Sequence, residues 1–164
     1  MNIIKFFEYF GDGEYAQYDN KFNSTFWGNM AAGCLPFAIT TKRFLLCFRS
    51  KYVNEPHTYG LWGGKVDNDD NIISTIKKEL YEESGFNSNI NLIPIFVYEN
   101  AEKTFKYHNF IGIIKNEFTP ILNWESDDYK WVTYNELLDI THKHPGLDLL
   151  LKDKKTLSII KKII

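Results

Sequence analysis

Apolar and polar positions follow one another along the chain in blocks that predict a mixture of strands and helices. Two continuous apolar runs, MAAGCLPFAI from residue 30 and FLLCFRS from residue 44, flank the polar residues 40–43, which predicts a hairpin. Pro36, inside the first run, is tolerated in a strand only at a sheet edge or a bulge. Further strands are expected at 59–66, 90–99, 105–115 and 129–133. Helices are expected at 135–140 and from just after Pro145-Gly146 towards Ile163, all within one domain spanning 1–164.

The clearest helical pattern lies in residues 63–86, which open with a glycine pair and pass through an Asp/Asn-rich loop. On a helical wheel, one face collects four apolar side chains: Ile72, Ile73, Ile76 and Leu80. Gly85 suits the C-terminal end of this helix. The glycines at the start are needed where main-chain groups must approach a metal or a phosphate closely.

Three acidic residues of this helix, Glu79, Glu82 and Glu83, stand at positions i, i+3 and i+4, so their carboxylates are neighbours. Most acidic helix faces are simply solvated. Glu83, however, falls within roughly 20° of Ile76 on the wheel, inside the apolar arc. A carboxylate placed there beside like charges is costly unless a cation compensates it. Convergent carboxylates suit Mg²⁺, Mn²⁺ or Ca²⁺ better than zinc, so the pattern favours a metal site.

The spacing of these residues resembles the Nudix signature: Gly, five residues, Glu, seven residues, then Arg-Glu-apolar-any-Glu-Glu-any-Gly-apolar. The matching positions are Gly64, Asp70 for the first Glu, Lys78 for the Arg, and then Glu79, Leu80, Glu82, Glu83, Gly85 and Phe86. Both departures keep the charge, although lysine lacks the planar fork with which arginine holds a carboxylate. The resemblance implies an α/β fold, a Nudix-like (MutT-like) α/β/α sandwich with a mixed β-sheet.

The same resemblance implies a hydrolase that cleaves the pyrophosphate linkage of a nucleoside diphosphate joined to another group. Nucleoside triphosphates, sugar nucleotides, dinucleoside polyphosphates and capped RNA all stay open as substrates. It implies that Glu79, Glu82, Glu83 and the main-chain carbonyl of Gly63 hold Mg²⁺ or Mn²⁺, and that Lys78 and Asp70 orient the carboxylates.

One more acid, Glu125, resembles the loop residue that serves in this family as metal ligand or general base. Its rival interpretation is a solvated loop acid, and the two are weighed nearly evenly. Which of Glu82, Glu83 and Glu125 takes the proton from water is also open.

Residues Arg49, Trp62 and Gly64 are the candidate substrate contacts. An exposed strand-end charge is an equally good interpretation of Arg49. The aromatic stretch 1–28 is expected to pack as an arm on the domain and cover a core edge, with base stacking by Phe26 or Trp27 a weaker alternative.

Composition narrows the function classes further. With 44% hydrophobic residues the chain is globular, and its net charge of −2 supplies no global basic field for nucleic acid. Cys34 and Cys47 are expected to be reduced core thiols in a cytoplasmic protein, since neither a secretory signal nor a membrane span is evident. Two other classes stay open, a non-catalytic nucleotide-binding module on the same fold and, more weakly, a calcium-binding structural protein. A homodimer is also left open.

Overall fold

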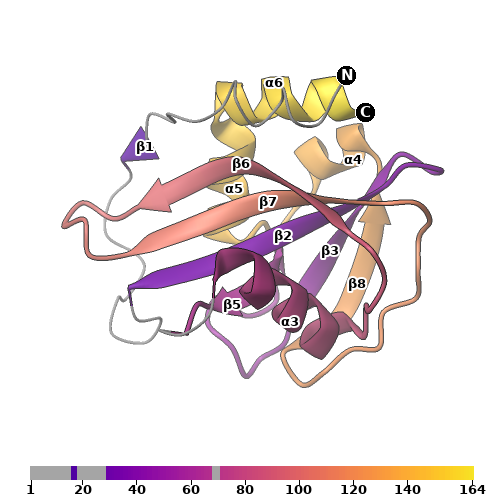
Figure 1. The fold of residues 1–164 in the computed structure, drawn as a ribbon, viewed down its shortest axis with the longest axis horizontal. Coiled ribbons are helices and arrows are strands. Elements are labelled where there is room, and N and C mark those ends of the chain that lie inside the picture. Colours follow the sequence, from indigo (N-terminus) through magenta and orange to yellow (C-terminus); the bar gives the residue numbers. More distant parts are fainter. Residues whose placement is uncertain (1–15, 18–28, 68–70) are drawn as a thin grey trace.

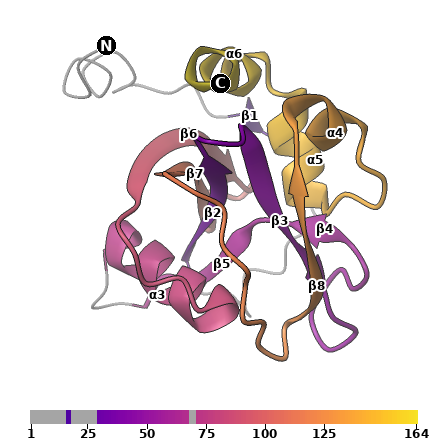
Figure 2. The ribbon, with the colours of Figure 1, turned by 90° about the vertical axis from the view of Figure 1, so that its right-hand side faces the viewer.

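The computed structural model describes residues 16–17, 29–67 and 71–164. Its strands are β1 (Ala16–Gln17), β2 (Met30–Ala38), β3 (Arg43–Arg49), β4 (Tyr59–Gly60), β5 (Trp62–Lys65), β6 (Asn91–Glu99), β7 (Lys106–Ile114) and β8 (Ser126–Val132). Its helices are α3 (Ile72–Ser84), α4 (Tyr134–Asp139), α5 (Pro145–Lys152) and α6 (Lys154–Ile163). The described strands form one eight-stranded mixed sheet, with α3 on one face and α4, α5 and α6 on the other (Figures 1 and 2). The expected α/β/α sandwich with a mixed sheet is confirmed.

Strand β2 lies at the centre of the sheet and changes partner along its length. Over its whole length it pairs with β7 in parallel. On its other side, residues 31–34 pair with β5 and residues 37–38 pair with β3, both antiparallel. Strand β3 also pairs with β4 and β8. The sheet therefore divides beside β2, with β5 next to α3 on one branch and β8 on the other.

Side chains of the central strands alternate between two apolar layers. In β2, Ala31, Leu35 and Phe37 belong to the large core that also contains residues of α4, α5 and α6. Ala32 and Cys34 face the other way, into the smaller core that contains Ile76 of α3. A strand buried on both faces has no polar side to show, which explains the continuous apolar runs of the sequence.

Pro36 lies in this central strand, so the expectation of an edge or a bulge is wrong. The pairing shows why proline is accepted. The amide of Ile39 donates to Ile114 of β7. Because main-chain amides alternate in direction, the nitrogen at position 36 points to the opposite side, where β2 has already left β5 and has not yet met β3. None of the described strands pairs with β2 on that side of Pro36, so the described sheet loses no hydrogen bond there.

Two expected elements are interrupted. The strand expected at 59–66 breaks at Leu61, whose carbonyl accepts a hydrogen bond from the Cys47 thiol, 3.3 Å away. The last helix is two helices, because Asp153 ends α5 and its carboxylate accepts from the amide of Thr156 at the start of α6. The other expected strands and the helix at 135–140 are confirmed, with ends that differ by at most three residues.

Three further observations concern the remaining sequence-based expectations. Cys34 and Cys47 are both buried and unbridged. Among the described helices, none is both long and apolar enough to cross a membrane. Phe26, Trp27 and Asp70 lie outside the described residues, and the roles expected for them stay predictions.

Candidate functional site

Helix α3 carries three of the predicted acids and has well-defined ends. The side chain of Asn71 accepts from the amide of Ser74 at the N-terminus. Gly85, with φ 71°, closes the C-terminus in the left-handed conformation, as the sequence predicts. The apolar face is narrower than expected, because Ile73 is 40% exposed while Ile76 and Leu80 are buried. Ile73 therefore does not belong to that face.

Glu83 is buried among the apolar residues of α3, as the helical wheel predicts. Its side chain is only 6% exposed, and its Oε2 atom accepts a hydrogen bond of 3.0 Å from the amide of Gly63. Burial raises the pKa of this carboxyl well above its usual range, and the charges of Glu125 and Glu79 raise it further. The Gly63 amide and Arg49 oppose this shift. An ionised Glu83 is therefore held in place by one main-chain donor and lacks full charge compensation.

Glu79 lies directly over Gly64. A Cβ atom built on this glycine would come within 2.7 Å of the Glu79 carboxyl carbon, so only glycine allows the carboxylate so close to β5. Burial raises the pKa of Glu79 to about 7, and the charges of Glu82, Glu125 and Asp67 add to the effect while Lys78 lowers it. The carboxylates of α3 thus lie close enough to repel one another.

Glu125 joins this group from a distant part of the chain. It precedes β8, and its carbonyl accepts from the amide of Ser50 at the end of β3, 2.8 Å away. Its own amide donates to Asn123 Oδ1 at 2.9 Å. Burial raises the pKa of its carboxyl, Glu82 raises it further and Arg49 lowers it. The fold therefore brings Glu125 to the three acids of α3, Glu79, Glu82 and Glu83, although it lies at least 42 residues further along the sequence.

These four carboxylates are a set of hard oxygen donors whose mutual repulsion a divalent cation would relieve. Within 16–17, 29–67 and 71–164, no three Asp, Glu, His or Cys side chains already stand at the spacing of a metal site. The residues fit a hard cation by donor type and by charge. Gly64 is consistent with such a site too, because its lack of a side chain lets the Glu79 carboxylate lie against β5.

Arg49 is a positive group close to two acids of this cluster, Glu83 and Glu125. Its Nε atom donates to the carbonyl of Asn54 at 2.9 Å, and its charge lowers the pKa of both Glu83 and Glu125. Among the ion pairs within 4 Å in the described part of the chain, none includes Arg49. A guanidinium near carboxylates but outside ion-pair distance is available to an anion.

Lys78 lies on the exposed side of the site. Its Nζ atom is 3.7 Å from an Asp67 carboxylate oxygen, and both side chains are substantially exposed. The charge of Lys78 lowers the pKa of Glu79. Lysine thus acts on the cluster through its charge, and its ion pair within the described residues is with Asp67.

Trp62 is not available as a substrate contact, and this prediction is wrong. The side chain is 0% exposed, and its Nε1 atom donates to the carbonyl of Leu45 at 3.1 Å. It packs with Leu80 beneath the acidic helix. Trp62 is the one aromatic side chain of β5, the strand that also contains the glycine pair, and it faces the apolar side of α3 instead of solvent.

Exposed aromatic residues of this region were missed by the sequence analysis. Trp124, which precedes Glu125, is 64% exposed. Tyr52 is 69% exposed, and its amide donates to the Ser50 hydroxyl at 3.3 Å, in the same residue that binds the Glu125 carbonyl. The adjacency of Trp124 to Glu125 was visible in the sequence, but its exposure was not.

Two polar side chains of the site, His144 and Tyr107, carried no sequence signal. His144 caps the N-terminus of α5 through Nδ1, which accepts from the amide of Gly146, and it also lies against Gly60. Burial lowers its pKa to about 3, and Arg49 contributes. The Tyr107 hydroxyl lies over Gly33, where a Cβ would come within 2.3 Å, and burial followed by Glu83 raises its pKa. Both come from elements that only the fold brings near Arg49 and Glu83.

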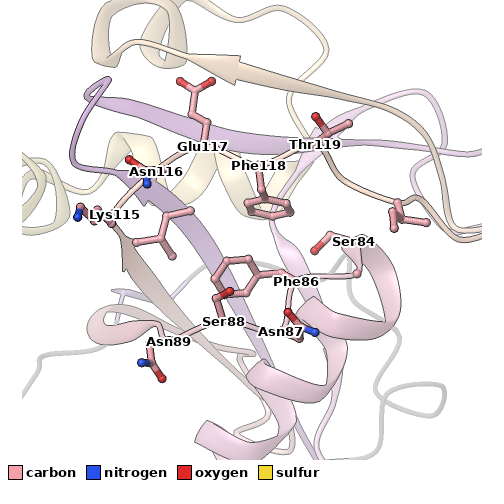
Figure 3. Close-up of a pocket in the computed structure, with 13 residues that line it drawn as sticks. Ser84, Phe86, Asn87, Ser88, Asn89, Lys115, Asn116, Glu117, Phe118 and Thr119 are labelled. Atoms are coloured by element: carbon pink, nitrogen blue, oxygen red, sulfur yellow. The ribbon is translucent and has the colours of Figure 1, made fainter.

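A pocket of about 530 Å³ lies beyond the C-terminal end of α3, between the two loops 84–89 and 114–121 (Figure 3). Phe86 and Phe118 pack against each other there with ring centroids 4.8 Å apart. Its acid, Glu117, is held by Arg43 through two hydrogen bonds of 2.6 and 2.7 Å. None of the acids predicted for catalysis lines it, so this pocket is separate from the carboxylate cluster.

Comparisons with known proteins agree with this geometry. The family model described as NUDIX domain matches residues 29–152. No curated protein sequence matched the chain. Solved structures share the fold at low identity. One is a Nudix hydrolase from M. smegmatis, RenU, at 19% identity and TM-score 0.68, covering 83% of this chain and 87% of that one.

Two other similar structures are described as complexes. A C. elegans Ap4A hydrolase binary complex is 20% identical, with TM-score 0.61 and coverage of 82% and 98%. The NUDIX domain of Shewanella oneidensis NrtR, complexed with ADP ribose, is 16% identical, with TM-score 0.63 and coverage of 82% and 88%. At these identities the likeness concerns the fold alone.

Proposed function

The chain belongs to the Nudix family, and we propose that it is a divalent-metal-dependent pyrophosphohydrolase acting on a nucleoside diphosphate linked to another group. The observation that carries this proposal is the group of four carboxylates around α3. Burial and mutual repulsion raise the pKa of Glu79, Glu83 and Glu125. Such a cluster is unfavourable by itself, whereas divalent cations would make it favourable.

We assign the cation-holding role to Glu79, Glu82, Glu83 and Glu125, with the main-chain carbonyl of Gly63 as a further oxygen. When bound, Mg²⁺ or Mn²⁺ would neutralise the phosphate oxygens and lower the pKa of a bound water. Glu83 is held by the Gly63 amide and is nearly inaccessible, which suits a fixed ligand.

Glu125 is the better candidate for the group that accepts a proton from water. It stands on a loop rather than on α3, and its carboxylate is less buried than that of Glu83. Its raised pKa brings it closer to the pH at which a general base is efficient. Arg49, across the cluster, would bind a phosphate of the substrate and keep Glu125 ionised.

The base or other group of the nucleotide would lie against exposed aromatic rings beside this cluster. Trp124 and Tyr52 are both largely exposed and flank the Glu125 main chain. Stacking of a base on such a ring contributes about 1–3 kcal/mol. They replace the buried Trp62 as our candidates for substrate recognition.

The test is a panel of nucleoside triphosphates, sugar nucleotides, dinucleoside polyphosphates and capped RNA, incubated with Mg²⁺ or Mn²⁺ and analysed for both products. We expect cleavage within a pyrophosphate linkage, abolished by chelation. The Glu82→Gln variant should lose at least two orders of magnitude in turnover while remaining folded, since it removes one charge from the cation site. Tight nucleotide binding without turnover of any substrate would instead support a non-catalytic nucleotide-binding module.

A further inference from the structure

The charges of this chain are unevenly distributed between its C-terminal helices and the rest. Residues 145–164 contain five lysines and two aspartates, a net charge of +3. Residues 1–144 contain 14 basic and 19 acidic residues, a net charge of −5. The overall value of −2 therefore conceals a basic end, and such an asymmetry is typical of a binding surface for polyanions.

The basic residues of α6 form one surface, here called the lysine face and made of Lys154, Lys155, Lys161 and Lys162. All four are exposed. At 100° per residue, Lys154 and Lys161 lie within about 20° of each other around the helix, and so do Lys155 and Lys162. The two lysines of each pair are therefore about 10 Å apart along α6, and Ser158, which lies between them on this side of the helix, is also exposed. α6 itself contains no acidic residue.

The two aspartates of this region are already engaged. Asp148 pairs with Lys152 at 2.6 Å, and Asp153 accepts from the amide of Thr156, also at 2.6 Å. Lys154 and Lys155 occupy the first turn of α6, where the helix dipole disfavours a positive charge by about 0.3–1 kcal/mol each.

The opposite side of α6 is fixed in the core and cannot turn outwards. Thr156, Ile159 and Ile160 are buried, and the Thr156 hydroxyl donates to the carbonyl of Ile95 in β6 at 3.0 Å. A helix that enters a membrane interface must bury its apolar side in lipid. The exposed residues of α6 are its four lysines and Ser158, so this helix has no exposed large apolar or aromatic side chain to insert into lipid. This argues against a membrane and in favour of phosphates presented by a macromolecule in solution.

We propose that the lysine face binds the phosphate backbone of a nucleic-acid strand without regard to its sequence. Lysines are flexible point charges that contact phosphates and do not select bases. Helix α6 lies at the top of the molecule in both views, whereas α3 lies in the lower part (Figures 1 and 2). This binding is therefore separate from the carboxylate cluster and goes beyond the hydrolase activity proposed above.

The experiment measures binding of a fluorescein-labelled oligouridylate of about 20 nucleotides by anisotropy, between about 50 and 200 mM KCl. Three or four neutralised phosphates predict a slope of log K against log salt of about −2 to −3. The Lys154→Gln/Lys161→Gln variant should bring this slope to about −1 and weaken binding at least tenfold at the lower salt. Glutamine keeps helix propensity, and the same melting temperature shows that the fold is intact.

The matched control is Lys103→Gln/Lys130→Gln, which removes two exposed lysines from other elements and should leave the slope unchanged. Hydrolysis of a small nucleotide should be the same in all variants, so a failure here is distinguishable from a failure of the proposed activity. Equal loss in both double variants would overturn the assignment to α6. Binding to anionic vesicles containing phosphatidylserine, without binding to the oligonucleotide, would overturn the nucleic-acid partner.

Discussion

At the level of single residues, the site contains a carboxylate in a position that is unfavourable for a charge. Glu83 sits inside the apolar arc of α3 at 6% exposure, with one main-chain donor from Gly63. Its raised pKa means that the folded chain holds a proton that the unfolded chain releases above about pH 4.5. The stabilisation from that proton is present below pH 4.5 and is lost as the pH rises through the folded pKa. At neutral pH the cation-free protein therefore bears a cost at this residue.

Glu83→Gln removes this cost, and we expect it to stabilise the protein in the presence of a chelator. The glutamine oxygen can still accept from the Gly63 amide, so only the charge is lost. The melting temperature should rise by about 2–4 °C for each kcal/mol gained in the free energy of unfolding. Hydrolysis should fall by at least two orders of magnitude. Thermal unfolding with and without Mg²⁺, beside a turnover assay, measures both effects.

Asp127→Asn is the control for this substitution, because Asp127 is an exposed acid of β8, two residues after Glu125. It should change neither melting temperature nor turnover. If Glu83→Gln were less stable than the natural chain with chelator present, the buried carboxylate would be stabilised by contacts other than a cation, and the metal assignment would fail.

His144 predicts a second effect, on pH dependence. Its pKa of about 3 in the folded chain lies below the unfolded value of about 6.5, so the unfolded chain binds the extra proton first. Stability from the neutral imidazole is complete above pH 6.5 and is lost as the pH falls towards 3. Between pH 7 and pH 5 this loss amounts to about 2 kcal/mol. His144→Asn should remove it while keeping a side-chain acceptor for the Gly146 amide.

Urea unfolding at the two pH values measures this difference. His142→Asn, in the same turn and exposed, is the matched control and should retain the natural pH dependence. The acids of the site are the same in all three proteins, so their effect on stability cancels in the comparison. An unchanged pH dependence in His144→Asn would show that this histidine is not held neutral.

Between elements, the contact of β5 with α3 depends on two adjacent glycines with different constraints. A Cβ at Gly63 would come within 2.2 Å of the Ala32 carbonyl oxygen and 2.5 Å of the Gly33 Cα, both rigid main-chain atoms. A Cβ at Gly64 would meet only the flexible end of Glu79. We expect Gly63→Ala to destabilise the fold by several kcal/mol and to yield little soluble protein.

Gly64→Ala should instead fold, with a melting temperature within a few degrees of the natural one, and lose at least tenfold in turnover because the Glu79 carboxylate is displaced. Thermal unfolding and steady-state kinetics of both variants separate the two effects. Equal activity in Gly64→Ala and the natural chain would show that the position of Glu79 over β5 is not needed for catalysis.

How much of these elements could be predicted follows from the range of the interactions involved. Helix α3 was predictable from its own periodicity and from Gly85, both local signals. The partner switch of β2 that accepts Pro36 was not, because it depends on where β5 and β3 meet that strand. The break at Asp153 was predictable in principle, because aspartate commonly caps a helix N-terminus, but the apolar residues continue at helical spacing across it and indicate one helix.

The site shows the same division. Glu79, Glu82 and Glu83 follow from helical spacing, and the burial of Glu83 follows from the wheel. Trp62 was misplaced because burial of an aromatic beside a glycine pair depends on which face of β5 meets α3. Tyr107 and His144 could not be found at all, since they approach Glu83 and Arg49 only through the sheet and the turn before α5.

At the scale of the whole molecule, the site depends on two branches of the sheet. The β5 branch lies against α3 with its three acids, and the β3 branch positions the loop before β8 through the Ser50–Glu125 main-chain hydrogen bond. The charge of Arg49, at the end of β3, lowers the pKa of one acid from each branch, Glu83 of α3 and Glu125 of the loop before β8. Glu125 is thus the only one of the four acids whose position relative to α3 is set by the tertiary fold alone.

This arrangement yields the last prediction. If Glu125 accepts a proton from water or holds a cation, Glu125→Ala should lower kcat by at least a hundredfold and change KM little, because the lost interaction develops mainly in the transition state. The main-chain bond to Ser50 is kept, so β8 and the fold should be intact. Asp127→Ala and Asp128→Ala change exposed acids two and three residues further on, in β8, and should have no effect on kcat. Steady-state kinetics of the three variants with saturating Mg²⁺ measures these effects.

Three equally small effects would make Glu125 a solvated loop acid and leave proton removal to α3, whereas a large effect at Asp127 or Asp128 alone would assign the role to a neighbouring residue. Because Glu125 is partly buried near the acids of α3 whereas Asp127 and Asp128 are exposed, we expect Glu125 alone to respond.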